Sequence, residues 1–260
     1  MPKNSDLTSR GMSRHQNLIW PLVTLAATSA ATADTVTLDL DSYAFGSSQM
    51  ISVNGSYAWD ETTGSEIFYN NKAYQHHWTD KSDGSSMITY CLQLYQGVDL
   101  GGSYDFTITD IEDSPTSPPF PGPMGEQRAI LLQDLYARWA DPLTAGLPMD
   151  KDEMNDAATA FQILIWEITH ERFSAEDASG MIDQIDLDLG ALQWNSNSAE
   201  ITGFLNVMVD SLGDGGFRDA ELVGLTNPNA QDQLSMIPAP GCLALVSLTA
   251  LGAPARRRRR

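Results

Sequence analysis

The segment that most constrains the fold of this chain is an apolar stretch near its middle. From Ala157 to Trp166 almost every residue is apolar, and Gln162 is the one amide within the run. A helix that is apolar on all sides is one that the rest of the protein covers on all sides. We therefore predict a buried helix over residues 155–171, around which the remaining elements are built.

Residue periodicity predicts further helices and strands around this buried helix. Leu132, Leu135, Tyr136 and Trp139 recur at the spacing of one helix face, with Pro142 expected to end that helix, and residues 200–212 predict a third helix. Strands separated by turns are expected in residues 35–60, and others at 87–94, 104–108 and 220–225, with a proline-rich loop at 113–125. The expected fold class is α+β: a β-rich N-terminal part, as a sandwich or sheet, with a helical insertion and a returning C-terminal strand.

Both ends of the chain have the composition of processing signals. At the N-terminus, basic residues precede the apolar run 18–27, and Ala31-Thr32-Ala33 follows as a small-residue cleavage site. These are the three parts of a secretory signal, so residues 1–33 are expected to be removed on export. An alternative, a short membrane anchor, is disfavoured because the run is too short to span a bilayer.

The C-terminal end combines Pro238-Ala239-Pro240, a short apolar run and the arginines Arg256, Arg257, Arg258, Arg259 and Arg260. This order resembles the PEP-CTERM sorting tail of exported Gram-negative proteins, although Ala239 replaces the usual acidic residue. The resemblance implies a processing enzyme of the exosortase type as a partner, transient contact with the inner membrane, and a destination at the cell surface or outside the cell. A plain tail anchor or an unstructured basic end is the alternative. The expected division is a signal at 1–33, one domain at 34–232, and the tail at 233–260, with residues 231–233 as a linker.

The body of the chain is strongly acidic. Residues 34–255 contain 7 lysines and arginines against 33 aspartates and glutamates. Such a surface repels phosphate backbones, so nucleic-acid binding is not expected. It suits a soluble protein outside the cell.

Cysteine usage singles out one thiol. The chain has two cysteines, Cys91 and Cys242, and Cys242 lies inside the expected tail. Removal of the tail leaves Cys91 alone in an oxidising compartment, where an unpaired thiol is either buried and inert or used chemically.

Gln162 is the natural chemical counterpart of this thiol. A buried amide without partners costs a few kcal/mol, so Gln162 is expected to be hydrogen-bonded or covalently used. A cysteine thiol and a glutamine amide that are held together in an apolar site can condense, with loss of ammonia, to an internal thioester, because their close geometry drives the reaction. Trp166, one helical turn further on, is placed to cover the pair, and Glu167 and His170 are candidates for the acid or base that assists the step.

Two motifs carry a resemblance to the thioester domains of bacterial surface proteins. They are Tyr90-Cys91 and, about 70 residues later, the helix segment from Phe161 to Trp166. The resemblance implies an adhesion or attachment module that couples covalently to an amine or hydroxyl on a surface or matrix macromolecule. Phe161 departs from the threonine common in Gram-positive adhesins. The alternative is a non-covalent structural protein of the matrix, in which Cys91 is a small buried hydrophobe and Gln162 bonds the backbone of a neighbouring strand.

Other motifs are weaker. His76 and His77, with Asp80 and Asp83 nearby, could bind a metal, but a solvated loop is the expected structure because adjacent strand residues face opposite ways. Nucleotide-binding loops, nucleophile elbows and zinc-protease motifs are absent from the sequence. We therefore expect no enzyme activity and no cofactor or metal.

Overall fold

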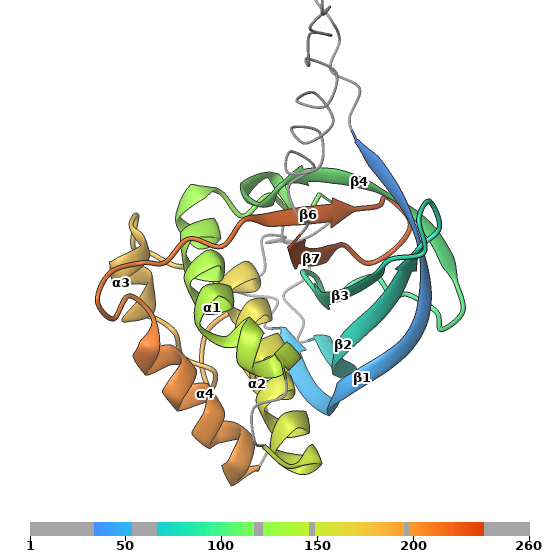
Figure 1. Ribbon diagram of the computed structural model, residues 1–260. Coiled ribbons are helices and arrows are strands. Elements are labelled where there is room, and N and C mark those ends of the chain that lie inside the picture. Colours follow the sequence, from blue (N-terminus) through green and yellow to red (C-terminus); the bar gives the residue numbers. More distant parts are fainter. Residues whose placement is uncertain (1–33, 54–66, 117–121, 146–148, 195–197, 237–260) are drawn as a thin grey trace, which may run out of the picture. The chain divides into compact units, whose positions relative to one another are not determined.

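The computed structural model describes residues 34–53, 67–116, 122–145, 149–194 and 198–236. The secretory signal expected at 1–33 and the sorting residues from Pro238 to Arg260 lie outside the described residues. Figure 1 shows helices packed against a strongly curved sheet. None of the helices in the described ranges has both the length and the apolar character that a bilayer-spanning segment requires.

The sheet is antiparallel throughout and closes on itself. Its strand order is β2-β3-β7-β6-β4-β1-β5, and a further pairing of β1 with β2 joins the two sides into a ring. The strands in the described part of the chain are β1 (Thr35–Val53), β2 (Ile67–Asp80), β3 (Ser86–Cys91), β4 (Ser103–Asp110), β5 (Leu192–Trp194), β6 (Leu222–Thr226) and β7 (Gln233–Met236). Strands followed by helices and then a returning β6 confirm the α+β prediction.

Strand β1 is the longest element of the sheet and pairs with three others. It was expected as separate strands joined by turns, but it runs unbroken and changes direction at two register shifts, between Leu40 and Ser42 and between Tyr43 and Gly46. At Gly46 the backbone φ is +137°, and a Cβ atom would collide with the carbonyl oxygen of Ala73. Glycine is required here because the backbone conformation at this bulge is left-handed and the partner strand β2 leaves no space for a side chain.

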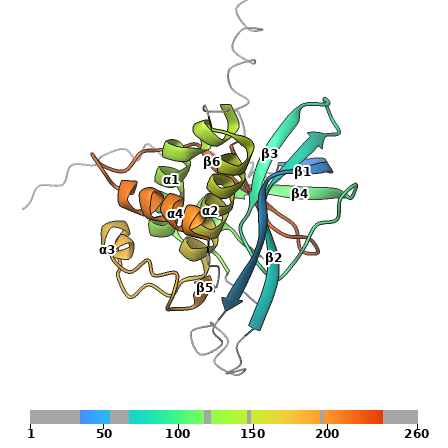
Figure 2. The same ribbon diagram turned by 90° about the horizontal axis from the view of Figure 1, so that it is seen from below.

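The helices lie together on one side of the sheet, as Figures 1 and 2 show. They are α1 (Glu126–Ala145), α2 (Lys151–His170), α3 (Ala178–Ile182) and α4 (Ala199–Ser211), with a short 3-10 helix at Ile111–Asp113. Helix α2 begins with a capping box, in which the Asp150 side chain accepts from the backbone of Glu153 and the Glu153 side chain accepts from the backbone of Asp150. It is buried almost continuously from Ala157 to its last residue, which confirms the predicted buried helix.

The core has two parts. The larger one lies between the helices and the sheet and is centred on α2, which contacts β1, β2, β3, β5, α1 and α4. The smaller one lies among the curved strands and consists of Leu38, Leu40, Trp78, Phe106 and Leu225. Burial of α2 on all sides therefore follows from its position between the sheet and the other helices.

Several sequence predictions need correction. Helix α1 continues to Ala145 rather than ending at Pro142, because a proline near the end of a helix removes only one backbone hydrogen bond. Strand β2 was not predicted, and residues 231–233 are not a simple linker, since β7 begins at Gln233 and pairs with both β3 and β6. The domain therefore extends at least to Met236, beyond the boundary expected at 232.

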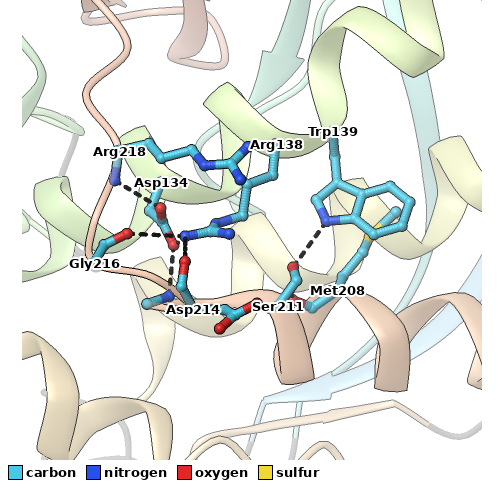
Figure 3. Close-up of polar contacts among 9 residues, drawn as sticks. Asp134, Arg138, Trp139, Met208, Ser211, Asp214, Gly216 and Arg218 are labelled. Atoms are coloured by element: carbon cyan, nitrogen blue, oxygen red, sulfur yellow. Dashed lines mark hydrogen bonds and ion pairs between the residues drawn. The ribbon is translucent and has the colours of Figure 1, made fainter.

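A buried ion pair ties α1 to the loop that follows α4 (Figure 3). Asp134 Oδ2 accepts from Arg138 Nε at 2.9 Å and from the backbone N–H of Gly213 at 2.7 Å. Asp134 Oδ1 accepts from the backbone N–H of Arg218 at 2.7 Å, while Arg138 donates to the carbonyl oxygens of Asp214 and Gly216. The side chain of Asp134 is 0% exposed, so its charge is compensated entirely by these donors.

We expect Asp134→Ala to lower the free energy of unfolding by about 3 to 5 kcal/mol, because it leaves Arg138 buried without its charge partner. Urea unfolding followed by circular dichroism measures this loss. Asp219→Ala, at an exposed position in the same loop, is the matched control and is expected to change stability little. Equal stability of the two variants would show that the ion pair does not hold the loop.

Candidate functional site around Cys91

Cys91 and Gln162 lie against each other in the core. Cys91 is the last residue of β3 and Gln162 is in the middle of α2, and they are 1% and 0% exposed. The backbone N–H of Cys91 donates to Gln162 Oε1 at 2.8 Å, and Gln162 Nε2 donates to the carbonyl oxygen of Cys91 at 2.8 Å. The fold thus brings together the two residues that the sequence singled out, 71 positions apart.

The Gln162 amide takes the place of a neighbouring strand. The pairing of β2 with β3 ends at His76 and Thr89, two residues before Cys91. On the other edge, β3 continues to pair with β7, and the N–H of Leu92 donates to the carbonyl oxygen of Asp232 at 2.9 Å. At Cys91 the two backbone groups left by β2 are therefore satisfied by one side chain from α2, which is the backbone-bonding alternative expected for this glutamine.

The sulfur atom of Cys91 contacts a different set of residues. Its Sγ lies 3.0 Å from Gln231 Oε1, 3.7 Å from His76 Nε2 and 3.9 Å from Gln233 Nε2. All three residues are buried, and the sequence analysis identified none of them as part of the site. Gln231 and Gln233 were assigned to the linker, and His76 to a solvated loop.

Groups that only donate or only accept fix the hydrogen-bond roles around the thiol. Trp78 Nε1 donates to Thr89 Oγ1 at 2.8 Å, so the Thr89 hydroxyl donates in turn to Gln233 Oε1 at 2.8 Å. Gln233 Nε2 donates to the carbonyl oxygen of Gln231 at 3.0 Å, which confirms the orientation of this amide. His76 Nδ1, 3.0 Å from Gln233 Oε1, must then carry the proton, because that oxygen only accepts.

This tautomer leaves Nε2 of His76 as the basic nitrogen, and Nε2 lies 3.7 Å from the Cys91 sulfur, against 3.8 Å for Nδ1. The second amide is oriented in the same way, since Gln231 Nε2 donates to the carbonyl oxygen of Gln93 and its Oε1 faces the thiol. The S–H of Cys91 therefore has two acceptors, Gln231 Oε1 and His76 Nε2.

Burial keeps the cysteine and the histidine uncharged. It raises the pKa of the Cys91 thiol far above its ordinary value, an effect that the hydrogen bond from Gln233 offsets only in part. It lowers the pKa of His76 to about 4, against the weaker raising effect of Gln233. The pair is accordingly a neutral thiol beside a neutral imidazole at pH 7, in contrast to the thiolate–imidazolium pair of an activated cysteine nucleophile.

Tyr90 and Trp166, the supporting residues suggested by the sequence, are both fully buried. The Tyr90 hydroxyl accepts from Gln75 Nε2 at 2.7 Å, and its ring packs edge-on against Phe161, with the ring centroids 4.7 Å apart. Trp166 is 0% exposed, and its Nε1 is buried without a hydrogen-bond partner among the described residues. Tyr90 therefore completes the packing on one side, while Trp166 contributes an unused donor on the other.

Glu167 and His170, the expected acid or base, have their hydrogen bonds elsewhere. Glu167 Oε1 accepts from the backbone N–H of Asp186 at 3.3 Å, and His170 Nδ1 lies 2.9 Å from the carbonyl oxygen of Trp166. Among the described residues, the hydrogen bond of the Glu167 side chain goes to neither the Cys91 thiol nor the Gln162 amide. His76 is the titratable group that the structure places next to the thiol instead.

His76 and His77 are on strand β2, so the expected solvated loop is wrong. Because strand residues alternate, His76 points inward and is 3% exposed, while His77 is only partly buried. The described residues contain no group of three or more histidine, cysteine or acidic side chains that could hold a metal ion.

A cavity of about 520 Å³ opens beside this cluster. Its lining comes from β1, β2, α2 and the loop after β3, and includes both residues that accept from the thiol. The lining residues are Tyr43, Asn71, Lys72, His76, Trp166 and Gln231, together with residues 96–100. The Cys91 sulfur thus lies directly behind the cavity wall, separated from it by His76 and Gln231.

We expect Gln162→Leu to destabilise the fold by about 2 to 5 kcal/mol, because it leaves the N–H and C=O of Cys91 buried and unpaired. The free energy of unfolding in urea measures the loss. Gln133→Leu, the same exchange at a partly exposed position of α1, is the control and is expected to be nearly neutral. A neutral Gln162→Leu would mean that the amide is dispensable for joining α2 to β3.

A second prediction concerns Glu167, whose pKa is raised well above 4.5 by burial and, next, by the neighbouring charge of Glu171. A raised carboxyl pKa means that the folded state favours the protonated form, so the group destabilises the fold increasingly as pH rises above 4.5. Glu167→Gln keeps the acceptor for Asp186 and removes the charge. We expect this variant to gain stability over the wild type at pH 8 and to gain much less at pH 5, as measured by urea unfolding.

The control is the exposed Glu221→Gln, for which the same pH comparison is expected to be flat. A Glu167→Gln variant that is less stable than the wild type at pH 8 would contradict the assignment of an unfavourable buried charge.

Comparisons with known proteins do not add a family to this geometry. No family model, no curated protein and no solved structure matched the chain. A function is therefore argued from the Cys91 site itself.

Proposed function

We propose that this chain is an exported surface or matrix attachment module, in which Cys91 and Gln162 form an internal thioester that acylates a nucleophile on a partner. The observation that carries the proposal is the placement of the Gln162 amide on both backbone groups of Cys91, with the two residues buried. That contact supplies the proximity without which the condensation of a thiol with a primary amide does not proceed.

The hydrogen bonds around the amide suit this chemistry. The Cys91 N–H that donates to Gln162 Oε1 polarises the amide carbonyl and stabilises the negative charge that develops on it during attack. Cys91 Sγ turns about its Cα–Cβ bond from Gln231 to the carbonyl carbon of Gln162. The S–H bond and the C–N bond break, a C–S bond forms, and the thiol proton passes through His76 Nε2 to the departing ammonia.

The thioester in turn reacts with a partner. An amine or hydroxyl attacks the Gln162 carbonyl carbon, the C–S bond breaks, and the Cys91 thiol is restored as the partner's proton is transferred to sulfur. Burial of the site protects the thioester from water, and the adjoining cavity is the route by which the partner arrives.

Export and processing complete the proposal. The signal at 1–33 directs secretion, and an exosortase-type enzyme processes the tail that includes Pro238 and Pro240, after transient contact with the inner membrane. The acceptor is a surface or matrix macromolecule, and the protein acts at the cell surface or outside the cell. The acidic body, with a net charge of −19 for the whole chain, suits a soluble role there.

A second candidate is a structural surface protein with the same fold and no covalent bond. One observation favours it: the Gln162 amide and the Cys91 thiol already have hydrogen-bond partners, so the cluster is satisfied without a reaction. The two candidates differ in one measurable property, the mass of the exported protein.

Intact-mass spectrometry of the purified exported protein tests the proposal. We expect the wild type to be lighter than its processed sequence by one ammonia and to gain one methylamine when incubated with that amine. Fragmentation is expected to place the methylamide on Gln162 rather than Gln231. The matched control, Cys91→Ala, is expected to keep the full mass and not to react.

A wild-type protein that has its full mass and does not react with methylamine would refute the thioester proposal and support the non-covalent structural protein. A methylamide on Gln231 would assign the acyl group to the wrong glutamine and overturn the Cys91–Gln162 pairing.

A further inference from the structure

We propose that the cavity beside Cys91 binds a saccharide, and that a sugar hydroxyl rather than an amine is the acceptor of the acyl group. The choice of acceptor rests on the proposed thioester, whereas saccharide binding by the cavity stands without it. The proposal names the substrate class from the hydrogen-bonding groups that line the cavity.

The wall of the cavity contains two hydrogen-bond donors that are not used within the described part of the protein. Trp166 Nε1 and Asn71 Nδ2 are both buried and have no hydrogen-bond partner among the described residues, and both residues line the cavity. Trp166 is fully buried, and an indole N–H only donates, so its orientation leaves no alternative role. Buried donors are normally satisfied, so a ligand for this cavity has to bring acceptor atoms.

A protonated amine does not match the unused donors of the cavity. An ammonium has three donors and no acceptor, so it leaves both Trp166 and Asn71 unsatisfied. The charged side chains that line the cavity are Lys72 and Asp99, so the lining itself carries no net charge that would favour a cation over a neutral ligand. A hydroxyl group accepts and donates at once and is neutral.

His76 can accept the proton of a bound hydroxyl. His76 Nε2 is the unprotonated ring nitrogen, it lines the cavity, and it is 3.7 Å from the Cys91 sulfur. A hydroxyl bound in the cavity can accept from Trp166 and donate to His76, whose Nε2 is 3.7 Å from the Cys91 sulfur. When its oxygen attacks the Gln162 carbonyl, an ester C–O bond forms, the C–S bond breaks, and the hydroxyl proton passes through His76 to the Cys91 sulfur.

The number of hydrogen-bonding groups that line the cavity favours a sugar over a single hydroxyl on a protein side chain. The cavity, about 520 Å³, is lined by donors from Asn71, Lys72 and Trp166 and by acceptors from Asp99 and His76. The ring of Tyr43 stands at the same wall, with the Lys72 ammonium 5.1 Å from its centroid. Several donors and acceptors beside aromatic rings match a polyol that carries many hydroxyls on an apolar ring.

Binding is tested first in the full chain with Cys91→Ala, which cannot form the thioester. The probe is a neutral methyl glycoside, and its affinity is measured by ligand-observed NMR titration. We expect the glycoside to bind, and excess methylammonium not to displace it. Trp166→Phe and Asn71→Leu, added singly to this background, are each expected to weaken binding about three- to tenfold, which corresponds to one lost hydrogen bond.

Asn206→Leu is the control for Asn71→Leu, since Asn206 lies on α4 away from this cavity and is exposed. Asn71→Asp adds a further readout, because a carboxylate attracts an ammonium, and it is expected to shift the preference toward methylammonium. Methylammonium binding in place of the glycoside overturns the proposal, as does glycoside binding that Trp166→Phe leaves unchanged.

The acyl transfer is tested in the wild type, by intact mass after incubation with the glycoside or with methylamine at equal concentration. We expect a glycoside ester on Gln162 to form at least as fast as the methylamide. Glycoside binding in the Cys91→Ala protein without ammonia loss in the wild type would refute the thioester alone. Ammonia loss with a methylamide and no glycoside binding would refute the saccharide alone.

Discussion

One side-chain amide joins the helical layer to the end of β3. Gln162 projects from the middle of a buried helix and satisfies both backbone groups of Cys91 where β2 no longer pairs with β3. An apolar residue at position 162 would leave two polar groups buried and unpaired. The position of Cys91, the divergence of β2 and the cluster around the thiol all depend on this contact.

The local signals in the sequence were sufficient for three helices, α1, α2 and α4, and for the central pair of residues, but not for the short helix α3. Apolar content alone predicted α2, and the lone amide within it drew attention to Gln162. Strand β2 was missed because polar residues such as Gln75 and His76 alternate with few apolar ones. What buries them is tertiary structure: pairing with the neighbouring strands β1 and β3, and contact with α2, which lies far away in sequence. Gln231 and Gln233 looked like linker residues for the same reason. Gln233 gains its role by pairing with Cys91 of β3, and Gln231 gains its role through side-chain contacts with the Cys91 sulfur and the carbonyl oxygen of Gln93.

The cluster around Cys91 is a polar network without charge inside an otherwise apolar core. Trp78 donates to Thr89, and both Thr89 and His76 donate to Gln233 Oε1, so each hydrogen bond has a defined direction. Burial keeps the imidazole neutral and the thiol protonated, so the thiol is not activated as a thiolate in this structure.

Strand β7 connects the Cys91 site to the chain beyond Met236. This four-residue strand is the last element before residue 237, and it lies between β3 and β6 with Gln233 next to Cys91. Tension on the chain beyond Met236 therefore enters the domain through β7 and is shared by the hydrogen bonds on its two edges. A load between a molecule held at Gln162 and an attachment on the C-terminal side would cross the fold over the short path from α2 through β3 to β7, and the other helices would carry little of it.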